Sequence, residues 1–176
     1  LEASLISKRT DVESNTALEA IRALQYEGTK AEIAQSFKEQ GNEMVKAKMW
    51  RDAKEFYTKG VAVLTAKGAD DKWEKGEDPE LEVKKEKQLE EQIYVNRALC
   101  NLELSTRCVL CMGVALADSS PENYRSTTLD CAAALRLNSS IVKAYYRSAS
   151  ALFALDKLPE AQDAAYRGLQ LEPNNT

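Results

Sequence analysis

Apolar residues along this chain recur at the period of an α-helix. Between residues 11 and 27 they fall at i, i+3, i+4 and i+7, as in the run from Ala17 to Leu24. This spacing predicts an amphipathic helix. A membrane-surface helix is the alternative, but the polar face lacks the Lys and Arg cluster that such helices use. We expect the helix to cover apolar surface at the N-terminal end of a helical domain.

Thr29 begins the next predicted helix. Glu32 follows three residues later, and the two form the sequence pattern of a capping box. We therefore expect a helix that starts near Lys30 and runs to about Lys48.

Small and aromatic residues recur three times with a period of about 34 residues. The first copy reads Phe37-x3-Gly41-x11-Ala53-x3-Tyr57-x2-Gly60 and the last reads Tyr145-x3-Ala149-x11-Ala161-x3-Ala165-x2-Gly168-x4-Pro173. The small residues fall where two antiparallel helices touch, and the aromatic residues fill the gap between them. The pattern resembles the tetratricopeptide repeat (TPR) consensus. That resemblance implies an all-α superhelix of three helix-turn-helix repeats with an N-terminal capping helix.

The repeats are interrupted twice. We expect them at about residues 34–67, 91–139 and 142–175, within a TPR domain over residues 30–176 that follows an N-terminal segment, 1–29. The first interruption is the charged linker and helix extension at residues 68–90. In it Asp78 as N-cap and Pro79 at the first helical position predict an early start of the next helix. The charge run is interpreted as a solvated helix face.

The second interruption, near residues 106–122, falls inside the middle repeat. It separates a helix predicted to end near Leu104 from one predicted to begin near Ser120. Its sequence is apolar where the repeat pattern expects a tight turn. Three interpretations stay open: a lineage-specific loop, sequence translated from an unspliced intron, and a hairpin that binds a partner.

Composition supports helices and excludes several function classes. Glycine (7) and proline (4) are scarce, which favours helices. The net charge is −4, whereas phosphate binding usually leaves a basic excess, so a nucleic-acid partner is not expected. No apolar run approaches the roughly 20 residues that span a bilayer, so no membrane partner is expected either. Because the chain begins at Leu1 without methionine, we expect it to be a piece of a longer protein.

The cysteines and the missing histidines narrow the chemistry. Four cysteines without regular spacing and no histidine indicate reduced thiols in a cytosolic or nuclear setting. Cys108 and Cys111 have metal-ligand spacing, but no second pair or histidine completes a zinc site. The absence of histidine also removes the commonest general base and every Ser-His or Cys-His pair. We expect no enzyme, no cofactor and no metal.

Five polar residues occupy equivalent faces of the first helices of the three repeats. Lys38 and Asn42 stand at i and i+4 in repeat one, Asn96 takes the corresponding place in repeat two, and Lys143 and Arg147 stand at i and i+4 in repeat three. The first helices of such repeats line a concave groove. Three cations and two amides there would form a site for paired carboxylates.

The segments around these residues resemble the carboxylate clamp of chaperone-binding TPR domains. The resemblance rests on Lys38-Glu-Gln-Gly-Asn42, Asn96-Arg97 and Lys143-Ala-Tyr-Tyr-Arg147. It implies a bound Glu-Glu-Val-Asp tail of heat shock protein 90, with heat shock protein 70 as a second candidate. Lys38, Asn42, Asn96 and Lys143 would hold the terminal carboxylates of the tail, and Arg147 would contact the peptide further along.

Two apolar residues and one departure complete the predicted site. Val45 and Leu99 lie one turn past Asn42 and Asn96, and we expect them to form an apolar floor for the valine of the tail. Glu103 departs from the pattern, because related clamps often have a cation near that place.

A more specific resemblance covers nearly the whole chain. The run from Ala17 to Thr29 leading into Phe37 to Glu43 is similar to the tetratricopeptide repeat protein 4 family, whose fungal member is the cyclophilin-seven suppressor. Residues 130–138 and 146–150 are similar to its fungal branch. This implies a cytoplasmic co-chaperone, with the nucleus as an alternative, whose client binds a C-terminal domain absent from this sequence. A TPR assembly scaffold without tail binding is the alternative.

Overall fold

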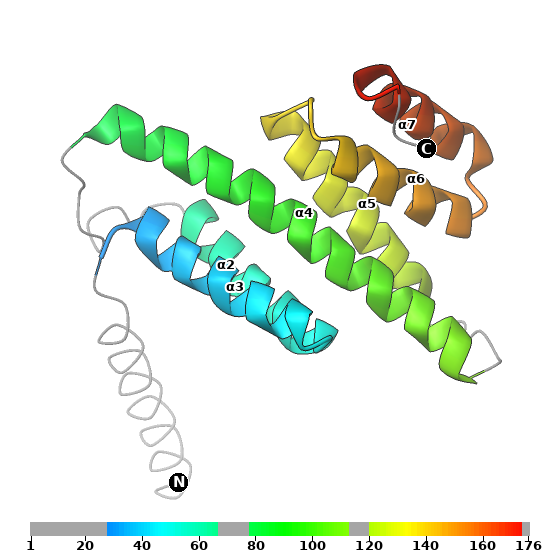
Figure 1. Cartoon of the computed structure of the whole chain (residues 1–176), viewed down its shortest axis with the longest axis horizontal. Coiled ribbons are helices and arrows are strands. Elements are labelled where there is room, and N and C mark those ends of the chain that lie inside the picture. The colour runs from blue at the N-terminus through cyan, green and yellow to red at the C-terminus, as the bar shows by residue number, and fades with distance from the viewer. Residues whose placement is uncertain (1–27, 67–77, 113–119, 174–176) are drawn as a thin grey trace, which may run out of the picture.

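The computed structural model describes residues 28–66, 78–112 and 120–173, and these ranges contain helices and no strand (Figure 1). The helices are α2 (Lys30–Lys46), α3 (Trp50–Thr65), α4 (Pro79–Met112), α5 (Ser120–Leu137), α6 (Val142–Ala154) and α7 (Leu158–Leu171). The predicted all-α class is confirmed for this part of the chain. The predicted helix at 11–27 and the polar linker at 68–77 lie outside the described residues.

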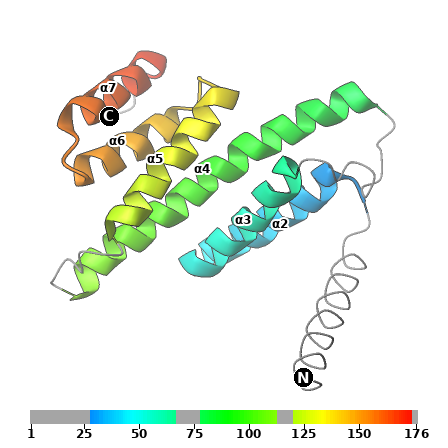
Figure 2. The same ribbon diagram turned by 180° about the vertical axis from the view of Figure 1, so that it is seen from behind.

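The helices pack in pairs that follow one another in a row. The pairs are α2 with α3, α4 with α5, and α6 with α7, and they are joined by contacts of α3 with α4 and of α5 with α6. Both views show the long helix α4 between the first pair and the later helices (Figures 1 and 2). Because α4 also contacts both α2 and α6, the first helices of the three pairs are neighbours.

The capping box predicted at Thr29 is present. The Oγ1 atom of Thr29 accepts a hydrogen bond from the backbone N–H of Glu32 at 3.3 Å, and Glu32 Oε2 accepts one from the backbone N–H of Thr29 at 3.0 Å. The helix ends at Lys46, two residues before the predicted end. Lys48 has a φ of 58°, which lies outside the right-handed helical region and turns the chain toward α3.

The long helix α4 starts as predicted and ends later than predicted. Asp78 Oδ1 accepts hydrogen bonds from the backbone N–H groups of Glu80 and Leu81 at 3.1 and 3.4 Å, as an N-cap does. The predicted end near Leu104 is wrong, because the helix continues to Met112. No glycine or proline interrupts the sequence from Glu80 to Met112, so the helix continues past the position where the repeat pattern expects a turn. Residues 113–119 of the insert lie outside the described residues.

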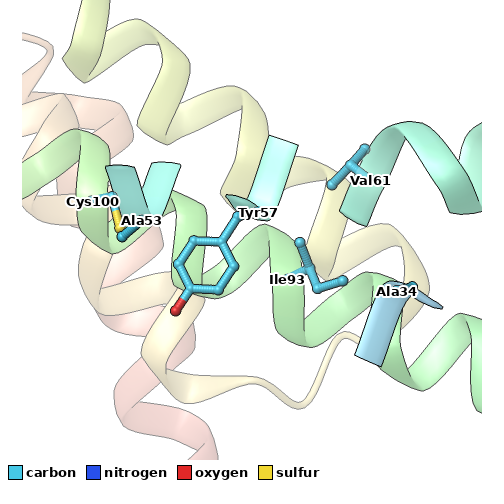
Figure 3. Close-up of a cluster of buried hydrophobic side chains, with 6 residues drawn as sticks. All are labelled: Ala34, Ala53, Tyr57, Val61, Ile93 and Cys100. Atoms are coloured by element: carbon cyan, nitrogen blue, oxygen red, sulfur yellow. The ribbon is translucent and has the colours of Figure 1, made fainter. Parts of the chain in front are cut away.

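The core of the first helix pair surrounds Tyr57 (Figure 3). Its buried members are Ala34, Ala53, Tyr57, Val61, Ile93 and Cys100. The Tyr57 ring is fully buried and lies against Gly41 of α2. A Cβ atom at Gly41 would lie 2.5 Å from Cε1 of Tyr57, closer than carbon atoms can approach. Glycine at position 41 therefore permits the ring position, and the small and aromatic positions of the repeat pattern meet here.

The second core cluster lies on the other side of α4. It consists of Val95, Ala98, Cys131, Ala134 and Ala144 from α4, α5 and α6. Because Ile93 and Cys100 of the same helix pack into the first cluster, α4 contributes side chains to both. Side chains of α4 thus connect the two core clusters along the row of helix pairs.

A buried ion pair links α4 to α5. Arg97 donates through Nη2 to Asp130 Oδ1 at 2.6 Å and through Nε to Asp130 Oδ2 at 3.0 Å. The Nδ2 atom of Asn101 donates to the same Oδ2 at 3.2 Å. Since only 7% of the Asp130 side chain is exposed, its carboxylate depends on these protein donors rather than on water.

We predict that Gly41→Ala lowers the free energy of unfolding by about 1–3 kcal/mol, although alanine is the better helix former. The added methyl group must displace the Tyr57 ring from its buried position. Urea denaturation followed by circular dichroism measures the change. Gly168→Ala is a milder comparison, because its new Cβ would lie 3.1 Å from Cβ of Tyr145. A Gly41→Ala variant as stable as the unaltered chain would contradict this packing.

We predict that Asp130→Ala costs about 3 kcal/mol or more of unfolding free energy, because it leaves the Arg97 guanidinium largely buried without its carboxylate. Asp163→Ala is the matched control: it removes an exposed ion pair with Arg167 whose side chains are 59% and 61% exposed. That variant should lose less than about 0.5 kcal/mol. Equal losses in the two variants, measured by urea denaturation, would show that the Arg97 pair adds no more than a surface pair.

Candidate functional site

The five predicted polar residues lie on the first helices of the three pairs. Lys38 and Asn42 are on α2, Asn96 is on α4, and Lys143 and Arg147 are on α6. Since α4 packs against both α2 and α6, these side chains come from three neighbouring helices. The structure shows what each of them contacts.

Asn42 is held by two hydrogen bonds. Its Oδ1 atom accepts from the Tyr57 hydroxyl at 2.7 Å and from Nδ2 of Asn96 at 3.1 Å. Burial raises the pKa of Tyr57 above its usual range, so the hydroxyl stays protonated and remains a donor at all physiological pH values. The side-chain amino group of Asn42 makes no hydrogen bond within the described residues. Asn42 is therefore fixed in position and still has a donor for an anion.

The two lysines differ in how they are held. Lys38 Nζ donates to Oε1 of Gln92 on α4 at 2.9 Å, which uses one of its three N–H groups. Lys143 is exposed and forms no hydrogen bond or ion pair within the part of the chain that the structure describes. The Lys38 ammonium group is thus held between α2 and α4. The Lys143 ammonium group has no protein partner within the described residues.

Arg147 has a structural contact in addition to its predicted role. Its Nη1 atom donates to the backbone carbonyl of Val95, which ties α6 to α4. Burial lowers the pKa of the guanidinium below its usual value, while the neighbouring Cys131, Cys100 and Tyr57 act in the opposite direction. The group stays charged, because arginine does not lose its proton in proteins. Its remaining N–H groups are the ones that a ligand could use.

A cavity of about 950 Å³ lies between α4, α6 and α7. Its lining includes the two predicted cations of α6 and mostly apolar side chains around them; among the lining residues are Leu99, Leu102, Glu103, Lys143, Tyr146 and Arg147. A second hollow of about 380 Å³ between α2 and the first turns of α4 is lined by Lys38, Lys85, Leu89 and Gln92. Both hollows therefore contain predicted site residues.

The two residues predicted to form the apolar floor are placed differently. Leu99 lines the large cavity. Val45 is half-buried and packs against the core cluster around Tyr57, and it is absent from the lining of that cavity. The sequence also gave no indication that the Tyr57 hydroxyl holds Asn42, since the repeat pattern marks this tyrosine as a packing residue. The hydrogen bond from the Tyr57 hydroxyl to Asn42 becomes evident only from the packing of α3 against α2.

The described residues contain no group of three or more His, Cys, Asp or Glu side chains that could hold a metal ion. Cys108 and Cys111 lie where side chains are not described. Burial raises the pKa of Cys100 and of Cys131 to about 12 each, so both thiols are protonated and poor nucleophiles at neutral pH. Within the described ranges, no helix is both long enough and apolar enough to span a membrane.

Comparison with curated proteins finds two fungal relatives, and no protein-family model matches the chain. The chain is 40% identical over 162 residues to the Hsp70/Hsp90 co-chaperone CNS1 of Saccharomyces cerevisiae, which covers 92% of the chain and 33% of the relative. It is 37% identical over 163 residues to the Hsp70/Hsp90 co-chaperone cns1 of Schizosaccharomyces pombe, which covers 93% of the chain and 36% of the relative. The chain thus spans about a third of the length of these relatives.

Solved structures agree with the fold. The Hsp90 co-chaperone Cns1 from Saccharomyces cerevisiae matches with a TM-score of 0.61 and 39% identity over 86% of this chain and 37% of that chain. The first TPR of Spaghetti (RPAP3), bound to the HSP90 peptide SRMEEVD, matches with a TM-score of 0.56 and 28% identity over 84% and 85%. The second TPR domain of human RPAP3, in complex with the HSP70 peptide SGPTIEEVD, matches with a TM-score of 0.57 and 26% identity over 84% and 89%.

These matches confirm the predicted TPR superhelix. The row of helix pairs, the packing of Tyr57 against Gly41 and the likeness to solved TPR domains all agree. The fold of the chain is therefore that of a TPR domain, and its close homologues are fungal Hsp70/Hsp90 co-chaperones.

Proposed function

We propose that this chain is the tail-binding TPR domain of a co-chaperone, a non-catalytic adaptor. Its ligand is the C-terminal Glu-Glu-Val-Asp tail of Hsp90, with the Hsp70 tail as a second ligand. The observation that carries the proposal is the hydrogen bond between Asn96 and Asn42, which brings the amides of two repeats together. The likeness to the two fungal co-chaperones and to the peptide-bound TPR neighbours supports it.

The geometry suits a ligand that ends in two carboxylates. An aspartate at a C-terminus carries one carboxylate on the main chain and one on the side chain. The amino group of Asn42 and the ammonium groups of Lys38 and Lys143 offer donors from two different helices, and hydrogen bonds between charged groups are the stronger kind. Because Tyr57 and Asn96 already hold the Asn42 amide, binding orders few further side-chain bonds there, which favours affinity.

Leu99 and Arg147 extend this proposed site. Leu99 lines the large cavity beside Lys143 and would contact the apolar valine of the tail, together with the predicted partner Val45. Arg147 lies at the same cavity with one N–H group bound to Val95. Its free N–H groups would face an acidic residue further along the peptide.

We also propose that the chain belongs to the tetratricopeptide repeat protein 4 family, and its 40% and 37% identity to the two fungal co-chaperones supports this. The TPR domain would span residues 30–176 after an N-terminal segment, in a cytoplasmic protein. Client binding would be carried out by the regions that this chain does not cover, which make up about two thirds of the length of the fungal relatives.

We predict that Lys143→Ala weakens binding of the peptide Ser-Arg-Met-Glu-Glu-Val-Asp roughly 30-fold or more, because losing one partner of a desolvated charge pair costs about 2 kcal/mol or more. Isothermal titration calorimetry measures the affinity. Lys84→Ala removes an exposed lysine on the first turns of α4, outside the large cavity, and should bind as the unaltered chain does.

The same titration distinguishes tail binding from an assembly scaffold. A C-terminally amidated peptide lacks one carboxylate and should lose most of its affinity. If the amidated and free peptides bind equally well, the clamp proposal is wrong and the scaffold alternative is favoured.

We predict that Tyr57→Phe weakens peptide binding about two- to tenfold and lowers the free energy of unfolding by about 0.5–1.5 kcal/mol. The variant keeps the ring that packs on Gly41 and removes only the hydroxyl that holds Asn42. Calorimetry and urea denaturation measure the two effects. Loss of stability with unchanged affinity would show that the Asn42 amide does not contact the ligand.

A further inference from the structure

We infer that Glu103 makes the large cavity selective for tails that carry a basic residue just upstream of the acidic C-terminal motif. This inference rests on the proposed function, because it needs the tail to be anchored at the clamp. Glu103 is then a specificity-determining residue that lies outside the clamp itself.

Glu103 is a half-buried carboxylate without a protein partner. It lines the cavity between α4, α6 and α7, and it forms no hydrogen bond or ion pair with any residue that the structure describes. Its neighbours in the lining on the same helix, Leu99 and Leu102, are apolar. A carboxylate in such a place gains most from a ligand that brings a positive charge.

Glu103 lies on the same side of α4 as the clamp residue Asn96. Asn96, Leu99 and Glu103 are at i, i+3 and i+7, which places them along one face of the helix. At 1.5 Å per residue, Glu103 is about 10.5 Å beyond Asn96 along the helix axis. The large cavity lies at this end of α4, because Leu99, Leu102 and Glu103 line it.

An extended peptide has the right length to bring its upstream residues to Glu103. Extended chain advances about 3.3 Å per residue, so a peptide anchored by its last residue at Asn96 reaches the level of Glu103 three or four residues earlier, between the first glutamate of the motif and the apolar residue before it. The long side chain of the next residue upstream can extend back to the carboxylate. Leu99, Leu102 and Tyr146 offer contact for the apolar residue that lies between.

The two cations that share the cavity lining with Glu103, Lys143 and Arg147, have roles of their own in the proposed site. Arg147 donates to the Val95 carbonyl, and Lys143 serves the terminal carboxylates in the proposed clamp. An arginine of the ligand can meet the Glu103 carboxylate with two parallel N–H bonds, whereas an acidic residue at that place would be repelled.

The peptides bound by the TPR neighbours differ at this position. SRMEEVD has arginine five residues before the terminal aspartate, and SGPTIEEVD has threonine there. In both peptides the following residue, methionine or isoleucine, is apolar. A cavity that contains Glu103 should therefore favour the first sequence over the second.

The test is a double-mutant cycle by calorimetry on the full chain. The peptides are Ser-Arg-Met-Glu-Glu-Val-Asp and the same peptide with alanine in place of arginine. Against the unaltered chain, the alanine peptide should bind about two- to fivefold more weakly, as for a partly exposed charge pair. Against Glu103→Gln the difference should disappear, and against Glu103→Lys it should reverse.

Controls separate this inference from the proposed function. Glu55→Gln makes the same charge change on α3, outside the cavity lining, and should keep the preference of the unaltered chain. If the arginine peptide keeps the same advantage over the alanine peptide in Glu103→Gln, Glu103 is not the determinant and the inference is overturned, while loss of binding on amidation still supports the clamp. If amidation has no effect on binding, the clamp and this inference both fail.

Discussion

The contact between Tyr57 and Gly41 is the constraint on which both the core and the candidate site depend. The ring fills the space that a side chain at position 41 would occupy, and it is fully buried among Ala53, Val61 and Ile93. From that position its hydroxyl reaches Asn42 on the opposite helix. The absence of a side chain at Gly41 in α2 thus allows the Tyr57 ring of α3 to pack closely. The hydroxyl of that ring orients the Asn42 amide, which is also bonded to Asn96 of α4.

Several candidate site residues also hold the helices together. Lys38 joins α2 to α4 through Gln92, and Arg147 joins α6 to α4 through the Val95 carbonyl. Next to Asn96, Arg97 fixes α5 through Asp130. Since the Lys38 and Arg147 contacts join first helices to one another, substitutions at these two residues change stability and site geometry together. Lys143 is different, because it forms no bond within the described residues, and its replacement acts on the ligand alone.

What the sequence predicts well in this chain is local or periodic. Thr29 and Asp78 lie within three residues of the backbone groups they cap, so their partners can be named from sequence. The clamp positions follow from the repeat period, which assigns each to the same face of a first helix. The hydrogen bond of Arg147 to Val95 spans 52 residues, and that of Tyr57 to Asn42 joins two helices, so neither follows from spacing. The late end of α4 shows the opposite error: the repeat period predicted a turn near Leu104, where helix-compatible residues continue the helix to Met112.

Charge presents the remaining physical problem, because a chain with a net charge of −4 is proposed to bind an acidic tail. At an ionic strength of 0.1 M, salt largely screens exposed charges that are more than about 10 Å apart. The ligand therefore interacts mainly with the charged groups that line its own path. In the proposed binding mode Lys38 and Lys143 serve the carboxylate end of the tail, while Glu103, which lines the same cavity as Lys143 and Arg147, faces the upstream residues. In this mode the site offers cations to the terminus of the ligand and a carboxylate to its upstream residues. A ligand that is acidic at its terminus and basic upstream matches this order, whereas a uniformly acidic peptide matches only the first part.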